Sequence, residues 1–287
     1  MYVDTLDHFA TVAREKADAA RTPVSFLAGA ALAGAYIGIA MILALTVAAG
    51  LPAGTRPLAM GAVFGIGLVL VIFAGAELFT GYALYCTVGL ARGTVTLAET
   101  IRLLGLVWIG NLAGALILVG LFAAGGGGGV FSTPDFLSGY VAHKVDAGPV
   151  AILARAMLCN WLVCLAIWSS ARVQGDTAKV IVMAWCLLAF VAPGFEHSVA
   201  DMTALGLGLV APGATLGLGP AMYDLIIATV GNIAGGGLFV AGAYLLAAQP
   251  KVARPAHSND CIPRAPAVPT VQDVPPRKTR LHPAELT

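Results

Sequence analysis

Residues 180–210 read VIVMAWCLLAFVAPGFEHSVADMTALGLGLV, a long apolar stretch that is interrupted in its middle. Pro193 and Gly194 disfavour a helix there, and the ionisable residues Glu196 and His197 follow at once. An ionisable side chain at the centre of a membrane costs about 2.5–3.5 kcal/mol on insertion scales, so such residues usually have a function. Non-helical backbone at that depth is tolerated only where it lines a cavity or is buried in protein. The stretch therefore predicts a membrane span that is broken around a functional site.

A second stretch, residues 57–91, has the same pattern. It is apolar except for Glu77, and the segment AGAELFTG at 74–81 interrupts it. A Gly-Asn-x-Ala-Gly sequence follows each interruption, with Asn111 lying 34 residues after Glu77 and Asn232 lying 36 residues after Glu196. A three-span unit that occurs twice must insert in opposite orientations. Paired broken helices in inverted repeats predict a transport site near the middle of the membrane.

The composition is that of a membrane protein. Of the 287 residues, 59% are hydrophobic and 11% are charged, and the mean hydropathy is +0.87. A soluble domain is about 25% charged, so a soluble enzyme is excluded. The net charge of +1 gives no basic surface for nucleic acid. We predict an all-α membrane protein with six transmembrane helices, which lie within residues 24–55, 57–91, 103–124, 149–171, 180–210 and 225–248.

The chain divides into three parts by charge. Residues 1–23 carry apolar side chains at helical spacing, which predicts a cytoplasmic amphipathic helix on the membrane surface. Residues 24–248 form the transmembrane domain, with inverted repeats over 24–124 and 149–248. Residues 249–287 hold nine charges and eight prolines, which predicts a disordered cytoplasmic tail. Thirteen Lys and Arg residues lie on the side of the N-terminus and three on the other, so both termini are predicted to be cytoplasmic.

Four polar residues are expected to support the two breaks. The carboxylates of Glu77 and Glu196 are predicted to accept hydrogen bonds from backbone N–H groups that are freed where the helices end. Asn111 and Asn232 are predicted to hold the broken segments in place, with contact to a substrate as the alternative. For the two glutamates, the alternative is a role as a base.

His197 is expected to face the pore together with Thr80 from the other break. Histidine suits proton-coupled passage because its proton affinity lies closest to physiological pH. Asp201 lies four residues after His197 on the same helical face, where it either supports the histidine or caps the cytoplasmic end of the helix. The five cysteines form no Cys-x-x-Cys pair, and we expect no metal, no cofactor and no catalytic residue.

Four segments carry a resemblance to a known family. The sequence resembles the formate/nitrite transporter family over residues 1 to about 248, and the stretch Trp185–Phe190 (WCLLAF) is closer to its nitrite branch than to its formate branch. The matching segments are Phe73–Gly81 (FAGAELFTG), Cys159–Trp168 (CNWLVCLAIW), Gly194–Met202 (GFEHSVADM) and Gly231–Gly237 (GNIAGGG). The family's usual E-H-S-x-A-N-M has Asp201 here in place of Asn.

The resemblance implies an inner-membrane homopentamer of aquaporin-like protomers with one pore each. It places a central histidine at His197, a threonine that meets it at Thr80, and a vestibule lysine at Lys144, sixteen residues before Asn160. By the same resemblance, the remaining pathway residues are Asn160, a cytoplasmic-side constriction of Leu68, Phe79 and Val163, and an outer constriction of Phe64 and Phe190.

The expected substrates are nitrite and formate, together with protons, in a protein surrounded by membrane lipid. Lys144 would attract the anion, which would take a proton from water or from His197 and cross the apolar constrictions as the neutral acid. The alternatives are a formate or hydrosulfide channel and an aquaporin-type pore for neutral solutes, although Asn-Pro-Ala motifs are absent. An intramembrane hydrolase built on Glu196 and His197 is disfavoured, because the sequence lacks a His-Glu-x-x-His metal motif.

Overall fold

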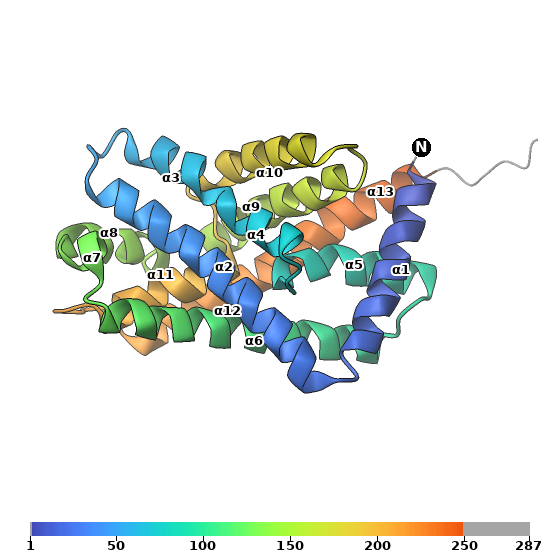
Figure 1. Cartoon of the computed structure of the whole chain (residues 1–287), viewed down its shortest axis with the longest axis horizontal. Helices are drawn as coiled ribbons and strands as arrows, with labels where there is room; N and C mark the ends of the chain where they lie inside the picture. Colours follow the sequence, from blue (N-terminus) through green and yellow to red (C-terminus); the bar gives the residue numbers. More distant parts are fainter. Residues whose placement is uncertain (1, 249–287) are drawn as a thin grey trace, which may run out of the picture. The chain divides into compact units, whose positions relative to one another are not determined.

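The computed structural model describes residues 2–248, which form helices and no strand (Figure 1). The predicted tail, 249–287, lies outside the described residues. Within the described part the helices are α1 Val3–Ala19, α2 Pro23–Ala49, α3 Arg56–Phe64, α4 Ile66–Phe73, α5 Phe79–Arg92, α6 Leu97–Ala124, α7 Gly128–Phe131, α8 Pro134–Val145, α9 Pro149–Ser170, α10 Asp176–Val191, α11 Ser198–Val210, α12 Leu218–Ala234 and α13 Ala243–Ala247, with a π-helical segment at Gly235–Gly242 between the last two.

Five helical stretches are long and apolar enough to cross a membrane. They are α2, the α3–α4 pair, α6, α9, and the continuous run from α12 to α13. The stretch 180–210, which the sequence predicted to be a broken span, consists of two shorter helices, α10 and α11, because the chain leaves the helical conformation between Val191 and Ser198. Helix α6 ends at Ala124, where the glycine run at 125–129 begins.

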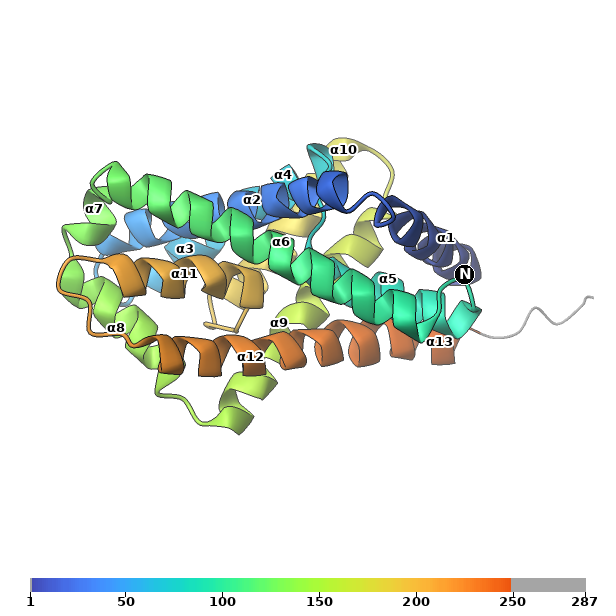
Figure 2. The same ribbon diagram turned by 90° about the horizontal axis from the view of Figure 1, so that it is seen from below.

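Helices α2 and α6 pack at very short range. A Cβ atom built on Gly34 of α2 would overlap the backbone of Asn111, and one built on Gly114 of α6 would overlap the carbonyl group of Ala31. In the second half, Gly235 makes the same close approach to the backbone of Met157 in α9. Small residues at such crossings let helix backbones meet, which is how helices associate inside a membrane. Figure 2 shows α2 and α6 running alongside each other.

The apolar face of helix α1, which the sequence predicted to lie on the membrane surface, packs on the protein. Its apolar face, which includes Leu6 and Phe9, is buried. The ring of Phe9 lies 5.6 Å from the ring centroids of both Tyr85 in α5 and Trp168 in α9. Helical spacing of apolar residues is the same for a lipid-facing and a protein-facing helix, so the sequence could not separate the two.

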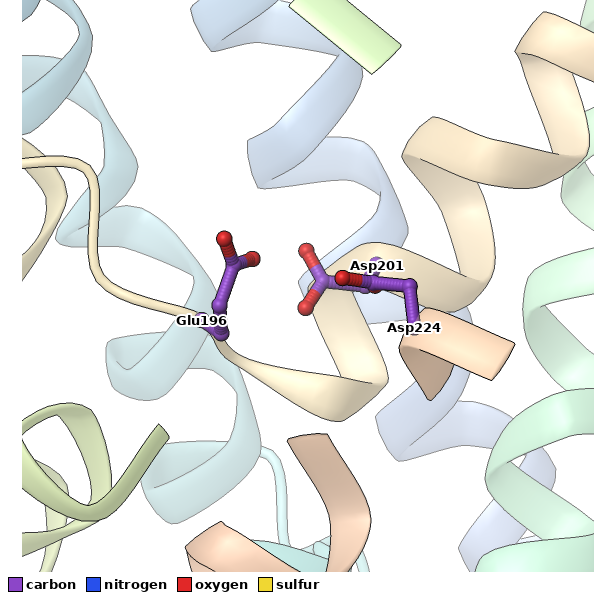
Figure 3. Close-up of side chains that lie close together, drawn as sticks. All are labelled: Glu196, Asp201 and Asp224. Atoms are coloured by element: carbon purple, nitrogen blue, oxygen red, sulfur yellow. The ribbon is translucent and has the colours of Figure 1, made fainter. Parts of the chain in front are cut away.

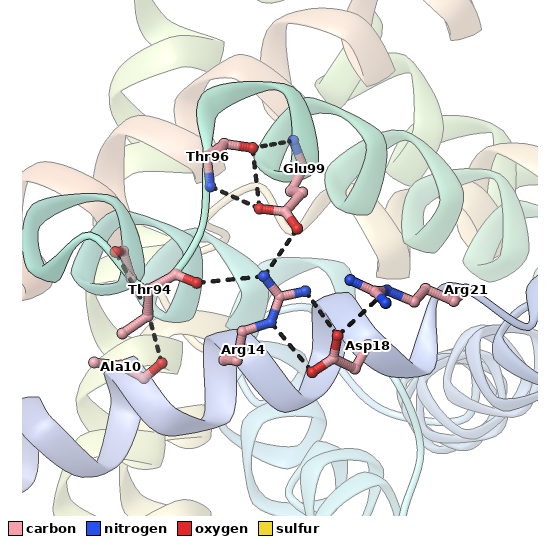
Figure 4. A network of polar contacts seen from close by, with 8 residues as sticks. Ala10, Arg14, Asp18, Arg21, Thr94, Thr96 and Glu99 are labelled. Atoms are coloured by element: carbon pink, nitrogen blue, oxygen red, sulfur yellow. Dashed lines mark hydrogen bonds and ion pairs between the residues drawn. The ribbon is translucent and has the colours of Figure 1, made fainter.

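Polar contacts tie α1 to the turn between α5 and α6 (Figure 4). The guanidinium of Arg14 donates to Glu99 at 2.8 Å, and the hydroxyl of Thr94 donates to the carbonyl of Ala10 at 2.8 Å. Glu99 also closes a capping box with Thr96 at the start of α6. The N-terminal helix is therefore held on the body of the protein by both an apolar and a polar contact.

The connection between the two halves, for which the sequence predicted no helix, contains α7 and α8. Helix α8 begins after Thr133 with Pro134 in its first turn, a favoured position for proline. It carries Lys144 in its last turn, and that side chain is buried. The fold thus brings a lysine from a connecting segment into the interior.

Candidate functional site

Two breaks in the helices form the framework of the site. The first separates the end of α4 at Phe73 from the start of α5 at Phe79, and the second separates α10 from α11. Each contains a glycine in the left-handed conformation, Gly75 with φ +76° and Gly194 with φ +77°. Glycine adopts this conformation without steric cost, which lets the chain turn sharply at both places.

Two asparagines bind the breaks in the same way. The side-chain oxygen of Asn111 accepts from the N–H of Phe79 at 2.9 Å, and its amide group donates to the carbonyls of Glu77 and Ala30, each at 2.8 Å. The side-chain oxygen of Asn232 accepts from the N–H of Ser198 at 2.9 Å. Each asparagine therefore bonds an N–H and a carbonyl group of a break and, in addition, one carbonyl group of a neighbouring continuous helix.

The amide group of Asn232 completes this match by donating to the carbonyls of Glu196 at 2.9 Å and Ala156 at 2.8 Å. Asn160 links the two breaks, because its amide group donates to the carbonyls of Thr80 at 3.0 Å and Asn232 at 2.6 Å. The sequence placed Asn160 on a substrate pathway. The structure buries it completely, with both amide hydrogens committed to backbone carbonyls.

The carboxylates of the breaks bind lysines, which differs from the predicted bonds to backbone N–H groups. Glu77 pairs with Lys16 of α1 at 2.7 Å and accepts from the hydroxyl of Tyr82 at 2.7 Å. Glu196 pairs with Lys144 of α8, and Arg155 of α9 lies 3.6 Å from its other oxygen. The side-chain oxygen of each asparagine already accepts from the first N–H group after the break. The glutamate carboxylates therefore pair with lysine side chains instead.

Two cavities lie at these lysines. The first has a volume of about 280 Å³, and the second has a volume of about 230 Å³. Lys144, Asp201, His197, Phe64 and Phe190 are among the residues that line the first cavity. Those that line the second include Lys16, Glu77, Leu68 and Tyr82.

Of the expected constriction residues, Phe64 and Phe190 line the first cavity and Leu68 lines the second. Phe79 and Val163 are buried and line neither cavity. Thr80 is also fully buried. The two cavities are thus both polar at their lysines, while the side chains expected to form the constrictions are apolar.

His197 lines the first cavity, and two contacts fix the orientation of its ring. Its Nδ1 accepts from the N–H of Ala200 at 3.1 Å, which caps α11. A ring nitrogen that accepts carries no hydrogen, so the neutral imidazole bears its hydrogen on Nε2. Nε2 lies 3.4 Å from the hydroxyl oxygen of Thr80. The ring stacks on Phe190 at 5.7 Å, and Phe64 meets it edge-on at 6.5 Å.

Three buried carboxylates gather beside the first cavity. Glu196, Asp201 and Asp224 come from three elements, and Figure 3 shows their carboxylates close together. One oxygen of each lies within 4.8 Å of the others. Lys144 contacts Glu196 and lies 2.7 Å from Asp201. Burial disfavours its charge, but Asp201 and Glu196 outweigh that effect and raise the pKa of Lys144 well above its ordinary value. Lys144 is therefore charged at physiological pH.

The chain matches known proteins over nearly the whole described part. A family model described as formate/nitrite transporter matches residues 4–246. The chain belongs to the formate/nitrite transporter family. The nitrite transporter NirC of Salmonella typhimurium is 40% identical over 272 residues, which are 93% of this chain and 99% of the relative.

Two solved structures resemble this formate/nitrite transporter. One, described as an FNT family ion channel, is 38% identical with a TM-score of 0.82, and the match covers 86% of this chain and 100% of that one. The other, described as a pentameric formate channel with formate bound, is 30% identical with a TM-score of 0.68 over 80% and 98% of the two chains. The relatives are transporters and channels, so this member of the family is a multi-pass membrane transport protein and no enzyme.

Two residues of the site in this formate/nitrite transporter were missed by sequence reasoning. Lys16 lies in the polar N-terminal segment, where a lysine has no distinguishing pattern. Asp224 lies just before the predicted sixth span and resembles an ordinary boundary charge, although its side chain is fully buried. A signal was present for Asp224, because the apolar run that contains it begins several residues earlier, at Leu218.

Proposed function

We propose that the protein conducts nitrite, and formate as a second substrate, across the cytoplasmic membrane together with a proton. The identity with NirC supports nitrite, and the resemblance to a structure with bound formate supports the second anion. The bonds that Asn111 and Asn232 make to the two breaks match atom for atom. This match supports two inverted repeats of three spans, with helices two and five broken.

The proposed assembly is a homopentamer with one pore in each protomer. The similar pentameric channel supports it. Large apolar side chains are exposed along the spans, and these suit contact with membrane lipid or with other copies of the chain. Examples are Ile101, Ile117 and Leu121 of α6. The excess of positive charge on the N-terminal side supports cytoplasmic termini, so the first cavity would face outward and the second inward.

The arrangement of charge along this path carries the proposal. A lysine lines each cavity, and we infer that buried apolar side chains that line neither, such as Phe79 and Val163, form a layer between the cavities. A desolvated anion is expensive in such an apolar layer, whereas the neutral acid is not. Nitrite and formate are bases of weak acids, so each can take up a proton as it leaves water. The lysines then concentrate the anion at both ends, and the layer passes the acid.

His197 supplies the hydrogen bond that the substrate meets inside the layer. Since its Nδ1 accepts from Ala200, its Nε2–H is the group available to donate to a passing oxygen atom. With the single hydrogen of the neutral ring used in this way, the proton on the substrate comes from water in the first cavity. Of the two proton sources that the sequence left open, the geometry therefore favours water.

The test is nitrite flux into proteoliposomes for His197→Phe, which keeps an aromatic ring and removes both the Nε2 donor and the Nδ1 acceptor that caps α11. A hydrogen bond between neutral groups contributes about 0.5–1.5 kcal/mol, and about 1.4 kcal/mol is a factor of ten, so we expect flux to fall about two- to tenfold. The matched control is His143→Phe, at an exposed position beside Lys144 in α8. Gel filtration verifies that both variants assemble as the wild type does. Unchanged flux in His197→Phe would contradict the assigned role.

A further inference from the structure

Asp224 is a buried carboxylate that the transport path does not use. It lies in α12 with no exposed surface, and neither of its oxygens has a hydrogen-bond partner among residues 2–248. Asp201 is also buried, and only its Oδ1 is bonded, to Lys144 at 2.7 Å. Figure 3 shows the two carboxylates close together. One oxygen of each lies within 4.8 Å of the other, and two buried carboxylates this close disfavour each other's ionisation, so that one of them tends to keep a proton.

The charges around this pair do not balance when every carboxylate is ionised. Two cations face three carboxylates, which leaves one negative charge in excess inside the protein. A buried charge without a partner is so unfavourable that such a group takes up a proton instead. The ionisable groups on the elements packed around the pair are Lys144 and Tyr140 of α8, Arg155 and Cys159 of α9, and Glu196 and His197 of the second break.

A proton fits this place better than a metal ion. The ammonium group of Lys144 already contacts Glu196 and Asp201, and it occupies the position that a cation would take between those carboxylates. One negative charge then remains, shared by Asp224 and the free oxygen of Asp201. A single proton is enough to neutralise it.

We propose that Asp201 and Asp224 form a proton-binding site that holds one proton at neutral pH beside the first cavity. In combination with the proposed function, this site sets the charge that an incoming anion meets. With the proton bound, two cations face two anions and the cluster is neutral. Without it the cluster carries one negative charge, which repels nitrite from Lys144. As the outer pH rises, nitrite entry slows because fewer protons are available to the substrate. The cluster loses its own proton as well, and the negative charge that remains slows nitrite entry further.

Asp201 gives the site access to the cavity. It lines the first cavity together with Lys144 and His197, whereas Asp224 lies behind it and lines none of the three cavities in the described chain. The proton can therefore exchange with cavity water through Asp201, next to the place where the substrate takes up its own proton.

The direct test is infrared spectroscopy of the purified full-length protein, which detects the carbonyl stretch of a protonated carboxyl group. We expect the wild type to keep this band at neutral pH. Asp224→Asn and Asp201→Asn should both lack it, because either change leaves two carboxylates for two cations. The matched control Asp176→Asn, which alters an exposed pair with Lys179, should keep the band. Absence of the band from the wild type, or its persistence in both cluster variants, would overturn the proposal.

Nitrite uptake by proteoliposomes at two outer pH values gives the second readout. Asp224→Asn should take up nitrite several-fold faster than the wild type at alkaline outer pH and at an equal rate at acidic pH. Identical pH profiles for the two proteins would overturn the link between the site and transport. A band that appears only after treatment with a chelator would also overturn the proposal, because a cation would then occupy the site. If the band behaves as expected but the wild type takes up no nitrite, the proton site stands and the proposed function fails.

Discussion

The substitution Asn232→Ala tests the way in which the second break is held together. It removes the side-chain oxygen and NH₂ group, which bond the N–H of Ser198 and the carbonyls of Glu196 and Ala156. The Ala156 carbonyl lies within α9 and keeps the hydrogen bond of its own helix, so the two groups left without a partner are the Ser198 N–H and the Glu196 carbonyl. All three bonded groups lie in a fully buried environment, since the Asn232 side chain has no exposed surface. The alanine side chain is too small to reach any of them, and it leaves a cavity beside Asn160.

The expected loss follows from this count of groups. A buried polar group that loses its partner costs about 1–3 kcal/mol, so two such groups give a lower bound of about 2 kcal/mol. Hydrogen bonds inside membranes have averaged only about 0.6 kcal/mol where the freed groups found other partners. Here the backbone of the break is fixed between two helices, so we expect that the freed groups find few other hydrogen-bond partners. The free energy of unfolding is therefore expected to fall by about 2 kcal/mol or more.

The assay is reversible unfolding of the detergent-solubilised protein by increasing fractions of a denaturing detergent. Asn111→Ala should lose a similar amount, because its three bonds match those of Asn232. The control is Thr46→Ala, which removes an exposed hydroxyl that bonds only to its own helix. A loss below about 1 kcal/mol for Asn232→Ala, or one no larger than for Thr46→Ala, would refute the reasoning.

Further substitutions probe packing and charge. Gly114→Ala should cost about 1–3 kcal/mol or more, because its Cβ would overlap Ala31 across the α2–α6 contact. Gly120→Ala on the same helix meets nothing and should be neutral or slightly stabilising in the same unfolding assay. Lys144→Met should cost about 3–5 kcal/mol, because it leaves buried carboxylates unpaired. Lys16→Met breaks a more exposed pair and should cost less than about 1 kcal/mol; equal losses for the two lysine variants would contradict this ranking.

The positions of the two breaks could be predicted because the sequence makes them exceptional. Glu77 and Glu196 are rare charges in long apolar stretches, and each lies next to glycines. The recurrence of Gly-Asn-x-Ala-Gly after both stretches also predicted that Asn111 and Asn232 would act at the breaks. In each case the sequence pattern is local, or repeats at nearly the same spacing, so no knowledge of the tertiary contacts was needed.

The partners of the glutamates could not be predicted, because they come from distant segments. Lys16 reaches Glu77 from the N-terminal helix, and Lys144 reaches Glu196 from α8. Helix α8 itself was missed, since the glycine run before it and its mixed polarity resemble a loop. Charge balance inside a membrane protein depends on these long-range pairs, and a single sequence does not specify them. For the same reason the buried Asp224 appeared to be an ordinary charge at the end of a span.

Passage of the substrate as a neutral acid is tested most directly by measuring nitrite and protons together. Proteoliposomes that contain the wild-type protein and an internal pH dye are given a nitrite gradient, and both species are followed in time. The account predicts that one proton enters with each nitrite and that a membrane voltage of either sign leaves the rate unchanged. Nitrite entry that follows the voltage, without acidification of the vesicle interior, would contradict it.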